Sequence, residues 1–66
     1  MEPNYPDINV QLSGSDGNSF MIMGKVSGAL RRAGVAKDAI DQFCNECMSG
    51  DYDHLIRTCM AWVSVS

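Results

Sequence analysis

The chain is so short that it can build only one small core. Its 66 residues correspond to a single domain, residues 1–66, with no room for a second. A domain of about this size buries only about 60% of the surface that its unfolded chain exposes, so its core is marginal when it stands alone. Small domains usually add disulfides, a metal or a partner subunit. This chain is therefore expected to draw on one of the three.

Two kinds of apolar pattern predict a mixed fold. Apolar and polar residues alternate over 8–12, as in a half-buried strand, and 62–65 is typical of a short terminal strand. The glycine-rich stretch 14–18 predicts a turn. Residues 1–6, with two prolines, are interpreted as a loose lead-in.

The segment after this turn allows two interpretations. Asp16-Gly17 is typical of a hairpin turn, which would make 19–23 a second strand. A helix has more support downstream, because apolar residues share one helical stripe and Gly34 stands where a helix often ends. We predict a helix over 19–33.

Two more helices are predicted, at about 37–48 and 52–61. In both, apolar residues recur at i, i+3, i+4 and i+7, and Asp51 can cap the second. The residues expected to face inward are Ile40, Phe43, Cys44 and Cys47, then Tyr52, Leu55, Ile56 and Cys59. The fold class is therefore α+β, a small domain of order β-α-α-α-β with two short strands packed against three helices.

The two strands predict self-association. A two-stranded sheet has open edges and is marginal by itself. Pairing of two copies across a two-fold axis would build a four-stranded sheet and enlarge the core. We therefore expect a homodimer.

Charge and composition exclude several classes of partner. Five basic and eight acidic residues give a net charge of −3, which disfavours a nucleic-acid or anionic-lipid surface. No apolar run approaches the 18 or more residues of a membrane span. The polar, acidic start shows no signal peptide, and three cysteines are an odd number. The expected location is the cytoplasm of a bacterial host cell, with reduced thiols.

The cysteines and the histidine permit a metal, redox or catalytic hypothesis, and each has a simpler explanation. Cys44 and Cys47 form a CxxC inside an apolar helical stripe, where cysteine behaves as a small hydrophobe. His54 is expected to point outward and lies away from Cys59 on a helical wheel, which disfavours a zinc site that contains both. A neighbouring aspartate would suit His54 as an acid–base group, but Asp51 is better explained as a cap. We expect no metal, no cofactor and no enzyme activity.

The helix predicted at 19–33 carries the candidate binding site. Its two glycines cost about 0.5–1 kcal/mol each relative to alanine. They lie away from the apolar stripe, on a face that has arginines suited to bidentate contacts. The candidate partner-binding residues are Met21, Gly24, Lys25, Gly28, Arg31 and Arg32. The alternative is a solvated face with two tolerated glycines.

Four stretches carry a resemblance to known sequences: 14–20, 29–35, 50–55 and the pair at 62–63. Together they make residues 7–65 resemble a group of short proteins from bacteriophage genomes and bacterial mobile elements, a group without an established activity. The resemblance brings no catalytic residue. It implies a setting in which small proteins bind and block a host factor.

Three functions are therefore carried forward. The first is a non-catalytic, phage-type binding protein, an inhibitor or adaptor that acts on a host protein, with an anti-defence protein such as an anti-CRISPR as the most specific version. The second is an oligomeric protein that sequesters a nucleotide or another small ligand through Lys25, Arg31 and Arg32. The third is a nucleic-acid binder, which the acidic balance disfavours.

Overall fold

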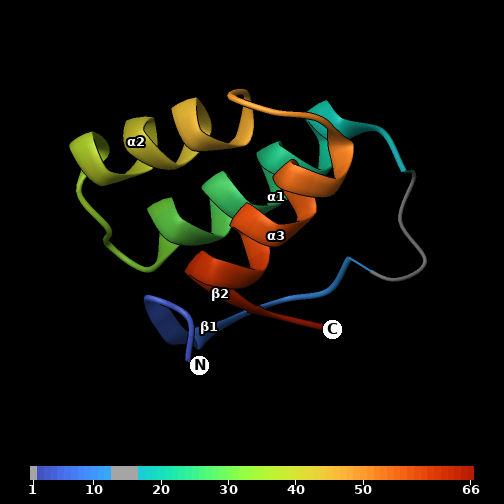
Figure 1. The fold of residues 1–66 in the computed structure, drawn as a ribbon. Coiled ribbons are helices and arrows are strands. Elements are labelled where there is room, and N and C mark those ends of the chain that lie inside the picture. Colours follow the sequence, from blue (N-terminus) through green and yellow to red (C-terminus); the bar gives the residue numbers. More distant parts are fainter. Residues whose placement is uncertain (1, 13–16) are drawn as a thin grey trace.

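The computed structural model describes residues 2–12 and 17–66 and has the predicted order β-α-α-α-β (Figure 1). The α+β fold class is thereby confirmed. The elements are β1 (Tyr5–Val10), α1 (Ser19–Arg32), α2 (Lys37–Cys47), α3 (Tyr52–Trp62) and β2 (Val63–Val65).

Local signals at both ends define α1. The side chain of Asn18 accepts hydrogen bonds from the N–H groups of Phe20 and Met21, so it is the N-cap. Past the end of the helix, Gly34 has φ 87° and the N–H of Val35 bonds back to the carbonyl of Leu30 at 3.0 Å. The predicted helix is confirmed, and a strand at its start is wrong.

The other two helices also follow their sequence signals. The side chain of Asp51 accepts from the N–H of His54 at 2.9 Å and caps α3, as predicted. That helix runs through Trp62, which was predicted to begin the last strand. As part of the helix, Trp62 has a buried ring that contacts Tyr5 of β1 and Phe43 of α2.

The sheet has two parallel strands with an irregular register. Tyr5 pairs with Val63 and Val10 pairs with Val65, so β1 contains a bulge between these pairs. The hydroxyl of Ser64 donates to the carbonyl of Pro6 at 2.8 Å and closes the bulge. The strand therefore begins at Tyr5, inside the segment interpreted as a lead-in. The turn predicted at 14–18 lies largely outside the described residues.

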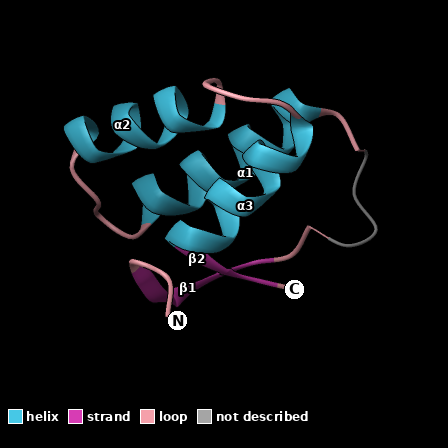
Figure 2. Cartoon of the chain, viewed as in Figure 1, coloured by secondary structure: helices cyan, strands magenta, loops and turns pink. Residues whose placement is uncertain are grey.

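The elements form three layers around one core (Figure 2). The two strands lie on one side of α1 and α3, and α2 lies on the other. Trp62 joins the layers, since it stacks on Tyr5 with ring centroids 5.9 Å apart and meets Phe43 edge to face at 5.5 Å. The fully buried side chains are Phe43, Leu30, Val26, Val63, Cys47 and Cys59.

Candidate functional site

The candidate site lies on the outer face of α1. Because Ile22, Val26 and Leu30 are buried on the inner face, the residues on the opposite side of the helix point outward. Among the site residues, five are exposed and Gly28 is half-buried; the exposed ones are Met21, Gly24, Lys25, Arg31 and Arg32.

Neither helical glycine is required by the packing of this chain. A Cβ added at Gly24 would meet nothing within 4 Å. At Gly28 it would meet Nη1 of Arg32 at 3.6 Å, an ordinary van der Waals contact. Each glycine still costs the helix about 0.5–1 kcal/mol relative to alanine. The fold itself therefore gives no reason for the bare strip of backbone that they leave on α1.

A hollow of about 280 Å³ lies between this strip and the end of β1. It is lined by Asn9, Val10, Gln11, Gly24, Lys25, Ala29 and Arg32. Three of the predicted site residues therefore meet here. Met21, Gly28 and Arg31 lie outside its lining.

Lys25 holds α1 to this end of the strand. Its Nζ donates a hydrogen bond to the main-chain oxygen of Gln11 at 2.8 Å. The ammonium group therefore bonds a backbone acceptor just past the end of the strand. Lys25 thus has a structural partner that the sequence did not predict.

A second hollow, of about 470 Å³, continues along β1 in the other direction. Its lining consists of Asn4, Tyr5, Pro6, Asp7, Ile8, Ala33, Gly34 and Val35. The linings of the two hollows together include every residue from 4 to 11, and we call this pair of hollows the β1 groove. Pro6 was the available sequence signal for it, because proline within a strand indicates a sheet edge.

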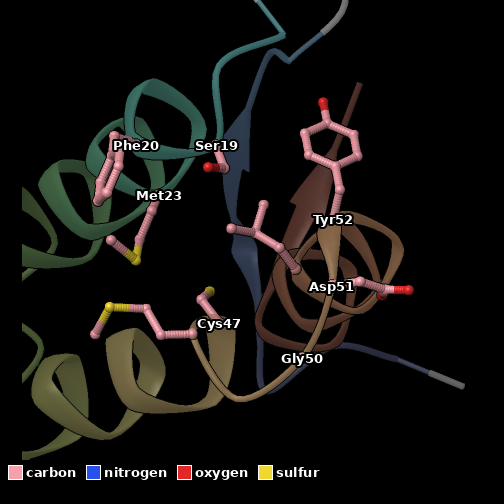
Figure 3. Close-up of a pocket in the computed structure, with 9 residues that line it drawn as sticks. Ser19, Phe20, Met23, Cys47, Gly50, Asp51 and Tyr52 are labelled. Carbon is pink, nitrogen blue, oxygen red and sulfur yellow. The ribbon is translucent and has the colours of Figure 1, made fainter.

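An apolar cleft of about 240 Å³ opens at the other end of α1, where the ends of three helices meet. Figure 3 shows Phe20 and Met23 of α1 on one side, Asp51 and Tyr52 on the other, and Cys47 between them. The exposed fractions are 73% for Phe20 and 46% for Tyr52. The prediction that Tyr52 faces inward is therefore wrong, since Leu55, one turn later, fills the core instead.

The thiols are part of the packing. Cys47 and Cys59 are buried on α2 and α3, and Cys44 is half-buried. Burial raises the pKa of Cys47 to about 12, with the neighbouring Cys59 adding to the shift, and burial also raises the pKa of Cys59. Both thiols are protonated at neutral pH and are poor nucleophiles. Within residues 2–12 and 17–66, no group of three or more His, Cys, Asp or Glu side chains could hold a metal ion.

His54 is half-buried, whereas the sequence predicted it to point outward. Its Nε2 lies 2.8 Å from the main-chain oxygen of Glu46 and 3.0 Å from the hydroxyl of Ser49. A carbonyl only accepts, so Nε2 carries a hydrogen and donates it. The ring is thereby turned toward the end of α2.

Comparison of the chain with models of protein families, with curated proteins and with solved structures finds no match. In the part of the chain that the structure describes, no helix has the length and apolarity needed to cross a membrane.

Proposed function

We propose that the chain is a non-catalytic binding module and that a partner protein docks on the outer face of α1. One observation carries the proposal: the glycines at 24 and 28 weaken the helix, and the fold does not use them. A bare backbone strip allows another chain to approach closely. Arg31 and Arg32 beside it offer planar, bidentate donors to carboxylates.

The state of the potential catalytic groups supports a binding role. The two buried thiols keep their protons at neutral pH because burial raises their pKa values. The ring of His54 is engaged by Glu46 and Ser49. The resemblance to short phage and mobile-element proteins supports the biological part of the proposal, an inhibitor or adaptor acting on a host protein in the bacterial cytoplasm, with an anti-defence role as its most specific version.

The test is affinity capture of the tagged protein from a bacterial host lysate, followed by mass spectrometry. We expect Arg31→Glu plus Arg32→Glu to lose a protein that the parent captures, because charge reversal adds repulsion and removes contacts. The control is Lys37→Glu plus Arg57→Glu, which makes the same change in net charge at exposed positions on α2 and α3. If the α1 double mutant retains every captured protein, the outer face of α1 is only a solvated face.

Thermal melting must accompany the capture. Both arginines lie in the last turn of α1, where glutamate interacts unfavourably with the helix dipole by about 0.3–1 kcal/mol each. The double mutant is expected to melt somewhat earlier yet remain folded at the temperature of the experiment.

The alternative of nucleotide sequestration has less support. Nζ of Lys25 is already bonded to Gln11, and Arg31 lies outside the lining of the hollow that contains Arg32. A thermal-shift panel of mono-, di- and cyclic nucleotides separates the two functions, since a ligand that binds the folded state raises its melting temperature. We expect no shift.

A further inference from the structure

The second edge of β1 faces α1. On the β2 side, the carbonyl of Val10 accepts from the N–H of Ser66 at 3.0 Å. In a β-ladder the backbone groups of alternate residues point to opposite edges, so Asn9 and Gln11 present theirs away from β2. The bond from Nζ of Lys25 to the oxygen of Gln11 shows that this edge lies beside α1.

The β1 groove runs along this edge. One wall is residues 4–11, and the other is Gly24, Lys25, Ala29 and Arg32 of α1 followed by the loop at 33–35. An extended chain rises about 3.3 Å per residue, so about eight residues would follow the groove from end to end. Such a chain would pass between a strand edge and a helix, the arrangement in which peptides bind by strand addition.

We infer that the β1 groove binds an extended acidic segment of the partner protein, which adds to β1 as a third strand. This inference rests on the proposed function, because it uses the same face of α1. It names the chemistry of the ligand: backbone pairing at Asn9 and Gln11, and a carboxylate at Arg32.

Charge complementarity selects an acidic segment. The chain has a net charge of −3, yet four of its five basic residues lie between Lys25 and Lys37. Lys25 and Arg32 line the groove, and Arg31 follows on the last turn of α1. Asp7 lines the other half. The carboxylate therefore belongs at the half of the groove next to Arg32.

The strand itself determines where pairing occurs. Pro6 has no N–H, and the bulge interrupts the ladder between Tyr5 and Asn9. Backbone pairing is therefore confined to Asn9 and Gln11. The oxygen of Gln11 has two lone pairs, so it can accept from the ligand while it accepts from Lys25.

Two pools of end-blocked octapeptides test the inference. Both alternate Val or Ile with Ser or Thr; one has Asp or Glu at two of the polar positions, and the other has Lys there. Binding is followed by NMR and by amide hydrogen exchange. We expect the acidic pool to bind at least about tenfold more tightly than the lysine pool. Exchange at Asn9 and Gln11 should slow by at least about tenfold, as for amides that become hydrogen-bonded.

Two variants and their controls make the test specific. Gly24→Leu fills the groove from a position where a Cβ meets nothing, so the protein should fold and binding should fall by at least about tenfold. Arg32→Glu should weaken binding of the acidic pool by a similar factor. Asn45→Leu also introduces an exposed leucine, on α2, and Arg57→Glu makes the same charge reversal on α3; both should leave binding unchanged.

Each failure has its own meaning. The inference is overturned if neither pool binds, if both bind equally, or if bound peptide perturbs Phe20 and Tyr52 in the apolar cleft instead of Asn9 and Gln11. If exchange at these two amides slows as the protein concentration rises, without any peptide, a second copy of the chain is the occupant. That result also overturns the inference. The proposed function survives any of these results if the captured partner still requires Arg31 and Arg32.

Discussion

The imidazole of His54 donates a hydrogen bond from Nε2 to the main-chain oxygen of Glu46 at 2.8 Å and so joins α3 to α2. Glu46 lies in the last turn of α2, and its main-chain oxygen also accepts from the N–H and the hydroxyl of Ser49. The ring reaches that carbonyl by passing over Gly50, at which an added Cβ would lie 2.7 Å from Cγ of His54. Gly50 is therefore needed for the contact between the two helices.

Gly50→Ala should lower the free energy of unfolding by about 1–3 kcal/mol, the usual cost of an overpacked site. The nearest atoms include Cβ of His54, at 2.8 Å, which cannot swing away as the end of a flexible chain could. Urea denaturation measures the effect. In the background of His54→Gly, which removes Cβ as well as the ring, the same glycine change should cost little, which gives a coupling of about 0.5–3 kcal/mol in a double-mutant cycle. Additive costs would mean that the ring does not constrain Gly50.

The buried thiol of Cys47 predicts a loss of stability at alkaline pH. Burial raises its pKa from 9.0 to about 12, so between these values the unfolded chain releases a proton that the folded chain retains. Stability from this group is complete below pH 9.0 and decreases as the pH rises toward 12, by up to about 1.4 kcal/mol per pH unit.

Urea titrations between pH 8 and 10 test the sign. Cys47→Ala should be less stable than the parent at pH 8, because it leaves a cavity, and its stability should decline less steeply with pH. The comparison between the two proteins cancels the titration of the shared groups that do not interact with Cys47. Equal slopes would show that the thiol ionises as easily in the folded chain as in the unfolded one.

Much of the helical structure could be predicted because its determinants are local. Asn18 and Asp51 cap helices with their own side chains, and Gly34 ends α1 with a positive φ. The strands were harder to predict because their determinants are distant in sequence. The bulge in β1 is closed by the bond between Ser64 and Pro6, and no local pattern indicates that pairing.

The same distinction applies to the candidate site. The helical wheel was enough to place Gly24 and Gly28 on the outer face of α1. It could not indicate the other wall of the β1 groove, because parallel pairing with β2 decides which edge of β1 lies next to Lys25. Tyr52 and His54 were misplaced for a related reason: both lie near the start of α3, where contacts with α1 and α2 decide their exposure.

Two phenylalanines provide a matched test of the core. Phe43 is fully buried against Trp62, whereas Phe20 is 73% exposed. Phe43→Ala should destabilise by about 3–5 kcal/mol, which is comparable to the whole stability of so small a domain. Phe20→Ala should change stability by less than about 0.5 kcal/mol. Leu55→Ala, at a second buried site, should cost about 2–5 kcal/mol.

Urea or thermal denaturation of the three variants gives the comparison. A Phe43→Ala protein that melts within a few degrees of the parent would show that the core does not depend on the contact between Phe43 and Trp62.

The last prediction concerns the outer edge of β2. A two-stranded sheet is marginal by itself, and pairing of two β2 strands across a two-fold axis would give four strands while leaving the β1 groove open. Gel filtration with light scattering should therefore give about twice the chain mass of 7.2 kDa at micromolar concentration. Val65 pairs with Val10, which bonds to the N–H of Ser66, so the N–H of Val65 points to the outer edge.

Val65→Pro removes that outward N–H without removing a bond to β1, and it should give a monomer. Val65→Ala trims the same side chain but keeps the N–H, and it should stay dimeric. A parent that elutes with the mass of one chain and still melts cooperatively would contradict the dimer. If the Val65→Pro protein remains dimeric, the interface lies away from β2. Hydrogen exchange of Asn9 and Gln11 at increasing protein concentration would then test the β1 edge as the interface.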